Sequence, residues 1–326
     1  MRVGYNPVKV MKPPLTPPHE ITAVIVTFIP YLSGYYEESL EVLKLCLESM
    51  RRNTSIPFDL VVFDNASCTD VREYLEEKQE QGFIQYLIFS EKNLGIPGAW
   101  NFALRATPGQ YLVFSDYDIY FHSDWLEVQM ELMHTFPNVG MVTGIPVRSP
   151  IKYSTNTLKW ARHTPDVQIE KGILQDWDVY WTHAKSTGYT KEQAQYLFEA
   201  GEDIKISYKE KSAFIGAGHF QFISPRKVLD AVLPVPYEIA MGNERYYDKE
   251  VNNKGFLRLT PTKMYVEHMG NTLPKDKQAP DTQKKGMIRQ KVSNAKSRFF
   301  DVPIIKKILL FIHGKIFRIY YRKVSK

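Results

Sequence analysis

Residues 110–121 read QYLVFSDYDIYF, and this stretch decides the fold class. Its first half, 110–115, is an apolar run typical of a strand that is buried on both faces of a sheet. Two carboxylates, Asp116 and Asp118, follow at once. In open α/β sheets, ligands bind beyond the carboxyl ends of the parallel strands. The stretch therefore predicts a buried strand that ends at a ligand site.

Upstream of this strand, apolar runs alternate with segments of helical spacing. The expected elements are, in order, strand 21–28, helix 36–52, strand 58–64, helix 71–81, strand 83–90 and helix 97–106. Strands and helices that alternate with short connections favour right-handed βαβ crossovers. The sequence therefore predicts an α/β fold with a mostly parallel sheet.

Downstream, the alternation becomes weaker. A helix at 125–136 and a strand at 139–145 are expected, followed by a strand and turn at 213–224 and a helix at 244–253 that stops before Gly255. Residues 146–212 lose the alternation. We interpret them as an insertion.

Length and cysteine content limit the class of protein. A chain of 326 residues can bury a large core. Its two cysteines, Cys46 and Cys68, do not suggest a disulfide framework and indicate a reducing interior. Residues 1–20 are proline-rich, lack the apolar core of a secretory signal and predict an irregular arm. Because no apolar run approaches 18 residues, we expect no membrane span and a cytoplasmic location.

The charge is distributed unevenly along the chain. The net charge is +6, but residues 282–326 carry 13 Lys and Arg against one acid, Asp301, which is +12. Subtracting this +12 from +6 leaves −6 for the remaining chain. Such asymmetry predicts an anionic partner for the basic segment, either lipid or nucleic acid.

Residues 303–323, PIIKKILLFIHGKIFRIYYRK, place isoleucines and leucines on one helical side and Lys and Arg on the other. This pattern predicts a basic amphipathic helix in the headgroup region of an anionic membrane, which places the protein peripherally at the inner face of the cell membrane. The alternative is a helix packed on the domain with solvated lysines. Nucleic acid is disfavoured because no recognised binding motif accompanies the charge.

Polar residues follow the other predicted strands as well. Asp64 ends strand 58–64, where a carboxylate could accept a hydrogen bond from a uracil imide or a ribose hydroxyl. Residues 93–101, NLGIPGAWN, combine glycines that permit close backbone approach with a helix start that offers free N–H groups. Asp116 and Asp118 are hard oxygen ligands of the kind that Mg2+ and Mn2+ prefer. Each segment alone could also be an ordinary turn.

Taken in order, four segments resemble glycosyltransferase family 2 and its relatives with the GT-A fold. They are VIVTF at 24–28, FDNASCTD at 63–70, NLGIPGAWNFAL at 93–104 and FSDYDIYF at 114–121. The resemblance covers 21–145 well and 213–271 more loosely. It implies a GT-A type, mostly parallel twisted sheet flanked by helices.

The resemblance also assigns donor residues. Thr27, Phe28 and Asp64 would hold the nucleotide base, with Asn93 and Gly95 beside the donor. Asp116 and Asp118 match the DxD motif of the family, whose last aspartate binds the metal, Mn2+ or Mg2+. Asp116 is a possible second ligand.

Three further matches lie near the C-terminal part of the predicted domain. The family carries an acidic pair, commonly Glu-Asp, about a dozen residues before a glycine that ends a helix. Here the pair is Asn-Glu, so Glu244 takes the position of the catalytic base, with Asp248 as the alternative one helical turn later. His268 resembles a histidine that contacts metal or diphosphate, and Gly218 lies in a loop that resembles one near the sugar and acceptor site.

The resemblance implies an enzyme that moves a sugar from a nucleotide-diphosphate sugar, with UDP favoured, to a hydroxyl on a glycan or lipid-linked acceptor. The reaction is expected to be metal-dependent and inverting, and to serve cell-surface glycan or glycolipid synthesis. The expected domains are an arm at 1–20, a catalytic domain at 21–281 and a basic helical tail at 282–326. In the catalytic domain, 21–145 would bind the donor and 146–281 the acceptor.

Other classes fit less well. A sugar-nucleotide pyrophosphorylase would carry a glycine-rich, basic loop after the first strand, where this chain has FIPYLSGYYEES at 28–39. A dehydrogenase would show G-x-G-x-x-G at that place. A non-catalytic relative that binds a nucleotide sugar or a membrane stays open as the alternative.

Overall fold

A ten-stranded sheet forms the centre of the molecule, in the order β3-β2-β1-β4-β10-β6-β11-β9-β8-β7. The computed structural model describes residues 14–238, 244–274 and 277. These residues belong to the first of two compact units, Met1–Gln278. The second unit, Ala279–Lys326, lies outside the described residues, and with it the predicted tail at 282–326.

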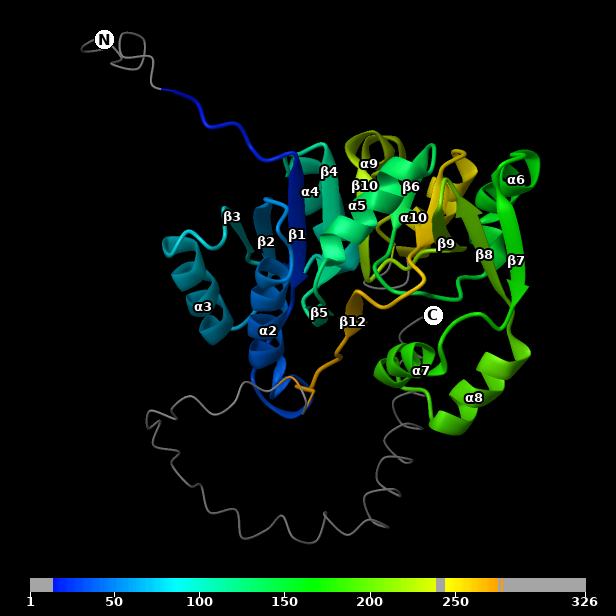
Figure 1. Cartoon of the computed structure of the whole chain (residues 1–326). Coiled ribbons are helices and arrows are strands. Elements are labelled where there is room, and N and C mark those ends of the chain that lie inside the picture. Colours follow the sequence, from blue (N-terminus) through cyan, green and yellow to red (C-terminus); the bar gives the residue numbers. More distant parts are fainter. Residues whose placement is uncertain (1–13, 239–243, 275–276, 278–326) are drawn as a thin grey trace, which may run out of the picture. The chain divides into compact units, whose positions relative to one another are not determined.

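The N-terminal half of the sheet is parallel throughout (Figure 1). Its strands are β1 (Ile21–Thr27), β2 (Asp59–Asn65), β3 (Tyr86–Ser90) and β4 (Tyr111–Asp116), and the helices between them are α2 (Ser39–Arg52), α3 (Thr69–Glu80) and α4 (Gly95–Ala106). A short 3-10 helix, η1 (Gly34–Tyr36), precedes α2. The four strands and three helices predicted for this half are confirmed.

The C-terminal half of the sheet is mixed. Its strands are β6 (Val139–Val142), β7 (Gln168–Gly172), β8 (Asp203–Tyr208), β9 (Lys211–Ile215), β10 (Gln221–Pro225) and β11 (Leu257–Thr260). The pairings make β6, β11 and β8 run with β1–β4, whereas β10, β9 and β7 run against them. Most strands thus share one direction, which confirms a mostly parallel α/β sheet flanked by helices.

Residues 146–212 contain more regular structure than their sequence indicates. They form η2 (Ile151–Tyr153), α6 (Thr155–His163), β7, α7 (Trp177–Ser186), α8 (Lys191–Ala200) and β8. In Figure 1 the pair α7–α8 lies below the strands β7–β9. The insertion therefore extends the sheet at one edge and adds three α-helices, α6, α7 and α8.

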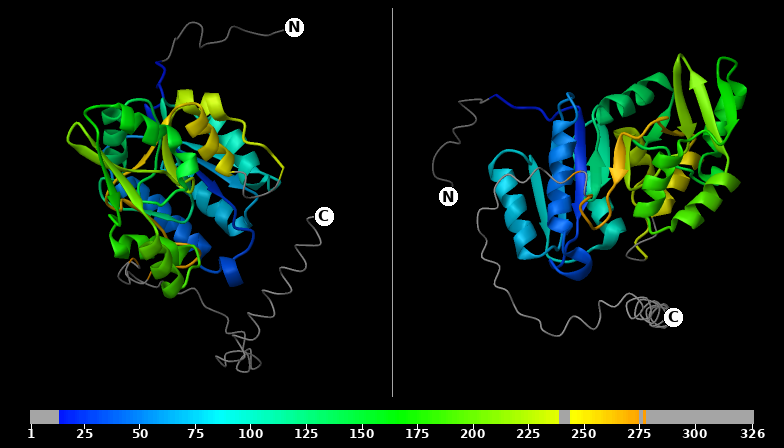
Figure 2. Two further views of the ribbon diagram at one scale, coloured as in Figure 1. Left: turned by 90° about the vertical axis from the view of Figure 1, so that its right-hand side faces the viewer. Right: turned by 60° about the horizontal axis from the view of Figure 1, so that its bottom comes forward.

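The two faces of the sheet carry separate cores, because side chains alternate along each strand. On β1, Ala23 and Ile25 pack into the cluster that contains α2, α3, α5 (Trp125–Thr135) and α6, whereas Val24 faces the other cluster. That second cluster contains α4, α9 (Arg226–Val232) and α10 (Glu244–Asn253). Figure 2 shows these helices on both sides of the sheet.

A small second sheet positions part of the site. It pairs β5 (Ile119–Phe121) with β12 (Val266–His268) in an antiparallel ladder that sets His268 opposite Ile119. Ile119 directly follows Asp118, and His268 lies nearly 150 positions further along the chain. The ladder therefore holds His268 beside the Asp116–Asp118 segment.

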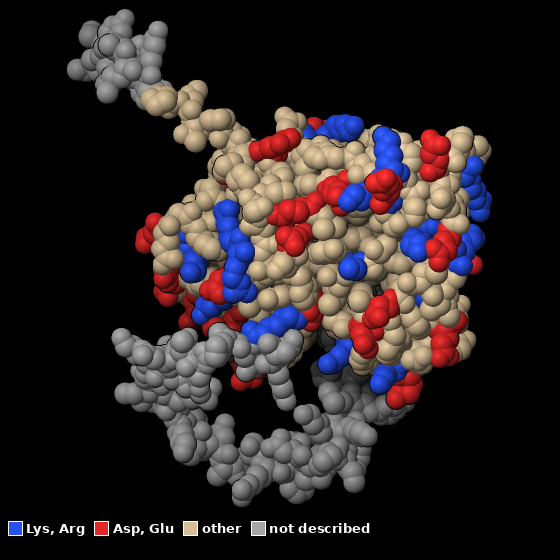
Figure 3. All heavy atoms as spheres, viewed as in Figure 1, with Lys and Arg blue, Asp and Glu red and all other residues tan. Residues whose placement is uncertain are grey.

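The helices and the surface of the described part bear on membrane contact. None of the helices in the described ranges has the length and apolar character needed to cross a bilayer. Acidic and basic side chains are interspersed on the face shown in Figure 3. That face therefore presents no large field of one sign.

Candidate active site

The carboxyl ends of β1, β2 and β4 lie along one edge of the sheet. In the ladders, Thr27 pairs with Asp64 and Val26 pairs with Asp116. Because neighbouring strands are about 4.8 Å apart, Asp64 and Asp116 stand roughly 10 Å from each other across β1. The sequence-predicted donor residues therefore share one edge.

Asp64 is completely buried and held by three protein groups. Its carboxylate accepts hydrogen bonds from Oγ1 of Thr27 (3.0 Å), from the backbone N–H of Ser67 (3.2 Å) and from Nε of Arg72 (3.1 Å). Arg72 also donates to the carbonyl of Ser90 at 2.6 Å. Asp64 thus fixes the ends of β1, β2 and β3 together, and its contact with a base remains a prediction.

Phe28 belongs to an aromatic cluster at the end of β1. Its ring meets Tyr36 edge-on at 6.4 Å, and Tyr36 also meets Tyr31 (5.3 Å) and Tyr35 (5.0 Å). Tyr31 and Tyr35 are more than half exposed. Burial, reinforced by the two neighbouring tyrosines, raises the pKa of Tyr36. The cluster offers aromatic surface where a planar base is expected.

Asn93 and Gly95 are tied to the end of β2 through Asn65, which the sequence analysis did not single out. Asn65 donates to Oδ1 of Asn93 (3.0 Å) and accepts from the N–H of Leu94 (2.8 Å). Asn93 in turn accepts from the N–H of Gly95 (2.8 Å), which adopts a φ of +65° at the start of α4. A left-handed φ favours glycine at this position.

The most distinctive feature is a group of acidic residues beyond β4. Burial first, and then the charges of Asp118 and Glu244, raise the pKa of Asp116 well above its usual value. Burial also raises the pKa of Asp118, although His268 opposes this effect. Glu244 is buried in the first turn of α10. Asp116 is therefore close enough to Asp118 and to Glu244 for both charges to act on it.

His268 joins this group through the β5–β12 ladder. Its Nε2 lies 3.4 Å from Oδ2 of Asp118, and the N–H of Met269 donates to the Asp118 carbonyl at 2.8 Å. The structure thus brings together Asp116, Asp118, Glu244 and His268, which the sequence placed in one site.

The residues of this group fit a divalent cation. Oδ1 of Asp118 and Nδ1 of His268 are buried and have no hydrogen-bond partner among the described residues. Unsatisfied buried polar atoms of this kind are rare unless an ion or water completes them. Within the described ranges no group of three or more His, Cys, Asp or Glu side chains is placed to hold a metal ion. Asp118 offers the carboxylate oxygen that a hard cation such as Mg2+ or Mn2+ prefers, and such an ion would take its other ligands from phosphates and water.

Asp248, the alternative base, has both carboxylate oxygens engaged. Oδ1 accepts from Nη2 of the fully buried Arg258 at 2.6 Å, and Oδ2 lies 3.0 Å from Nδ1 of His219. This arrangement suits the positioning of His219 better than proton abstraction. Arg258 was missed in the sequence because no motif marks it, and His219 had no clear role there.

A cavity of about 600 Å³ lies beside His268 and Asp248. Gly218 lines it, fixed by Thr143, whose hydroxyl accepts from the Gly218 N–H (2.8 Å) and donates to its carbonyl (2.7 Å). Burial, reinforced by His268, lowers the pKa of His183 in the cavity wall to about 4. The wall is formed by Val147, Arg148, Ser149, Pro150, Lys152, Tyr153, His183, Thr187, Tyr189, Ala217, Gly218, His219, Phe220, Arg245, Asp248 and His268.

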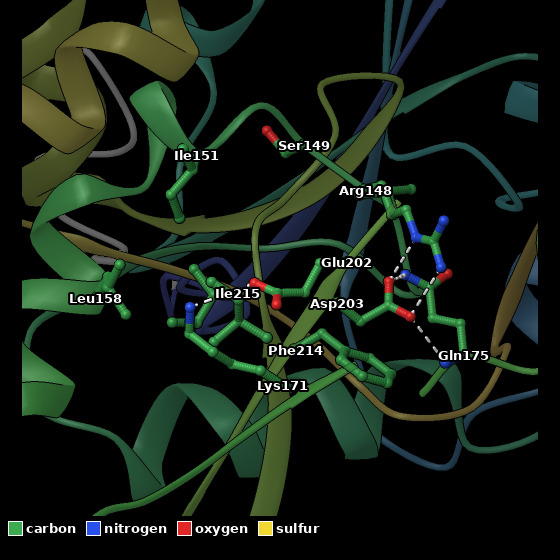
Figure 4. Close-up of a pocket in the computed structure, with 12 residues that line it drawn as sticks. Arg148, Ser149, Ile151, Leu158, Lys171, Gln175, Glu202, Asp203, Phe214 and Ile215 are labelled. Carbon is green, nitrogen blue, oxygen red and sulfur yellow. Dashed lines mark hydrogen bonds and ion pairs between the residues drawn. The ribbon is translucent and has the colours of Figure 1, made fainter. Parts of the chain in front are cut away.

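A second cavity of about 330 Å³ shares the segment 147–149 with the first (Figure 4). Figure 4 shows Arg148 and Gln175 pointing toward Asp203. The Arg148 guanidinium donates to both Asp203 oxygens, at 2.7 and 3.0 Å, and to the carbonyls of Leu197 and Phe198. Its donors are thus used within the protein.

The sequence matches a known family over half of its length. Residues 34–198 match the family Glycosyl transferase family 2, which is half of the chain. The chain belongs to glycosyltransferase family 2. This glycosyltransferase carries Asp64, Asn93, Asp116 and Asp118 inside the matched span, whereas Glu244 and His268 lie beyond it.

Two relatives of this family 2 glycosyltransferase come from Rickettsia. An uncharacterized glycosyltransferase of Rickettsia bellii (strain RML369-C) is 31% identical over 87 residues, which are 27% of this chain and 12% of that protein. One of Rickettsia felis (strain ATCC VR-1525 / URRWXCal2) is 30% identical over 87 residues, 27% of this chain and 14% of that protein. The chain therefore spans a small part of the length of these relatives.

Two solved structures are similar at low identity. The mannosyltransferase PcManGT from Pyrobaculum calidifontis, in complex with GDP-Man and Mn2+, is 15% identical, with a TM-score of 0.48 over 80% of this chain and 58% of that chain. S. aureus TarS 1-349 in complex with UDP-GlcNAc is 14% identical, with a TM-score of 0.46 over 78% of this chain and 62% of that chain.

Proposed function

We propose that this glycosyltransferase moves a sugar from a nucleotide-diphosphate sugar, with UDP favoured, to a hydroxyl of a glycan or lipid-linked acceptor. The reaction would depend on a divalent metal and invert the anomeric centre. The proposal is carried by one observation, the grouping of Asp116, Asp118 and Glu244 with His268 at the end of β4. Mutually repelling carboxylates gain most from a cationic ligand.

The donor would lie along the carboxyl edge of β1, β2 and β4. Its base would meet the aromatic cluster of Phe28 near Thr27 and Asp64, and its diphosphate would face Asp118. Gly95 and Asn93 would border it from the start of α4, where the first N–H groups of the helix favour negative charge. The site therefore has an aromatic end for a base and a carboxylate end for a metal-bound diphosphate.

Asp118 and His268 would hold Mn2+ or Mg2+, with Asp116 as a possible further ligand. When bound, the ion would neutralise charge on the departing nucleoside diphosphate as a Lewis acid. Asp116, at the end of β4, could also accept a hydrogen bond from a hydroxyl of the donor. The fully buried ends of β1 and β2 hold these groups rigidly, which favours a preorganised site.

Glu244 would accept the proton of the acceptor hydroxyl as that oxygen attacks the anomeric carbon. It is 6% exposed and lies at the start of α10, close enough to Asp116 to raise the pKa of that residue. A base on the side opposite the diphosphate gives direct displacement with inversion. General-base assistance of this kind contributes about 10²–10⁴-fold to the rate.

The function is tested by Glu244→Gln with Glu250→Gln as a matched control on the same helix. We expect Glu244→Gln to lower kcat for transfer by about 10²–10⁴-fold while the protein still binds UDP with Mn2+. The control should retain both values. Transfer by Glu244→Gln at close to the wild-type rate would remove Glu244 from this role.

We also propose that the enzyme acts in cell-surface glycan or glycolipid synthesis, as a peripheral protein at the inner face of the membrane. The support is the basic amphipathic pattern of residues 303–323, which lie outside the described residues. The enzyme would then meet a membrane-anchored acceptor at the membrane surface.

A further inference from the structure

We infer that the acceptor carries an anionic group, a carboxylate or a phosphate, which Lys152 and Arg245 bind in the 600 Å³ cavity. The inference rests on the proposed function, since it assigns this cavity to the acceptor. The cavity lies next to His268 and Asp248, and so borders the group at which transfer is proposed.

The charges of the cavity wall do not cancel. Its acidic side chain, Asp248, is offset by the fully buried Arg258 at 2.6 Å. Arg148 is offset by Asp203, on which it makes two hydrogen bonds. Lys152 and Arg245 remain, and neither forms an ion pair with an acidic side chain of the described residues. The cavity thus keeps two positive charges.

The two cations come from elements that pack against each other. Lys152 lies in η2 and Arg245 in the first turn of α10. Arg258 fixes this contact, because its guanidinium donates both to the Tyr153 carbonyl (2.8 Å) and to Asp248 on α10 (2.6 Å). The two positive side chains are therefore carried by rigidly connected backbone, as a recognition site requires.

The rest of the wall suits a sugar. The ring of His183 stacks on Phe220 at 5.0 Å and an interplanar angle of 30°, and Tyr153 and Tyr189 also face the cavity. Aromatic faces pack against the apolar faces of sugar rings and leave their hydroxyls to polar groups. A neutral sugar would leave both cations without a partner, whereas an acidic sugar or a sugar phosphate would pair with them.

The test measures binding of small probes to the full chain by isothermal titration calorimetry. Methyl glucuronide carries a carboxylate, glucose 6-phosphate carries a phosphate, and methyl glucoside is the neutral control. Hydrogen bonds to charged groups contribute enough for about a tenfold gain in affinity. We expect at least one anionic probe to bind about tenfold more tightly than methyl glucoside, and the tighter anion identifies the group.

Two pairs of variants test whether the preference for the anionic probe arises in the cavity. Lys152→Gln and Arg245→Gln should each reduce the advantage of the anionic probe severalfold. Lys159→Gln on α6 and Lys249→Gln on α10 remove the same charge from exposed positions outside the cavity wall, and should retain the advantage. Equal affinities for anionic and neutral probes, no measurable binding of either anion, or equal effects of cavity and control variants would each overturn the inference.

Binding of UDP with Mn2+, and slow donor hydrolysis without acceptor, report separately on the proposed function. If both persist while the anionic probes show no preference, the acceptor assignment fails and the transferase proposal stands. If the wild-type chain shows neither, the transferase proposal fails, and with it the inference that rests on it.

Discussion

Oδ1 of Asp248 accepts a hydrogen bond from Nη2 of Arg258 at 2.6 Å, and the side chain of Arg258 is 0% exposed. Burial lowers the pKa of Arg258, and the charge of Asp248 opposes this effect. A guanidinium in such a place depends on its partner, because a lone buried charge is strongly unfavourable. The pair links β11 to α10 and so supports the wall of the larger cavity.

Removing Arg258 should therefore destabilise the fold. We expect Arg258→Met to lower the free energy of unfolding by about 3–5 kcal/mol, because Asp248 is left buried with His219 alone. Urea unfolding followed by circular dichroism measures the change. Glu41→Gln, which breaks an exposed pair with Lys44 on α2, is the control and should cost less than about 1 kcal/mol. A cost for Arg258→Met no larger than that of the control would contradict the prediction.

The Arg148–Asp203 pair should make stability depend on pH. Burial alone would raise the pKa of Asp203, but hydrogen bonds from Arg148 and from the backbone of Leu174 and Gln175 lower it below 3.8. A carboxyl whose pKa is lower in the folded state stabilises the fold above its unfolded pKa, and this contribution is lost as the pH falls through the folded value. The contribution is thus complete above about pH 5 and declines below about pH 4.

The measurement compares wild type with Asp203→Asn from pH 3 to pH 7. We expect the difference in the free energy of unfolding between wild type and Asp203→Asn to be largest at pH 7 and to decrease toward pH 3. Glu202→Gln, which alters a neighbouring exposed carboxylate, should show no comparable narrowing. A gap that stays constant across this range would rule out the pair as the source of the dependence.

Metal binding should depend on Asp118 in a way that does not require turnover. We expect Mn2+ to increase the rise in Tm that UDP produces in the wild type, because a ligand of the folded state stabilises it in proportion to occupancy. Asp118→Asn should lose this increment, and excess chelator should remove it from the wild type. The exposed Asp166→Asn on the insertion serves as control. Persistence of the Mn2+ increment in Asp118→Asn would take Asp118 out of the metal site.

Membrane contact is predicted for residues 303–323, outside the described part of the chain. Each basic residue near an anionic surface contributes about 1 kcal/mol. We expect full-length protein to float with vesicles that contain anionic lipid, and a version that ends at Asp301 to stay in solution. Vesicles of neutral lipid should recover little of either version of the protein. Equal recovery of the two versions with anionic vesicles would exclude a membrane role for this segment.

The N-terminal half of the fold could be predicted because its signals are local. Strands β1, β2 and β4 are buried on both faces, so each is a continuous apolar run, and the polar residues that end them mark the site. The edge strand β7 gives no such signal, because Gln168–Gly172 is mostly exposed. The stretch 213–224 contains two strands, β9 and β10, and the sequence does not show that β6 and β11 lie between them.

The acidic group was predictable through the family pattern. The residues that hold the other site residues in place were not. Arg72, Asn65 and Arg258 act through partners that lie elsewhere in the chain, such as Asp64, Asn93 and Asp248. No spacing rule connects such pairs. Likewise, the sequence does not show that Arg258 and His219 occupy both oxygens of Asp248.

The ion pair between Arg148 and Asp203 joins the two ends of the segment that lies between these residues. Strand β7 of that segment and strand β8, which begins at Asp203, stand at the sheet edge farthest from β1. Insertions or deletions between the two residues would therefore leave the ladders of β1, β2, β3 and β4 intact. We therefore expect length changes between Arg148 and Asp203 to alter the cavity wall at His183 without altering the strand ends that carry Asp64 and Asp116.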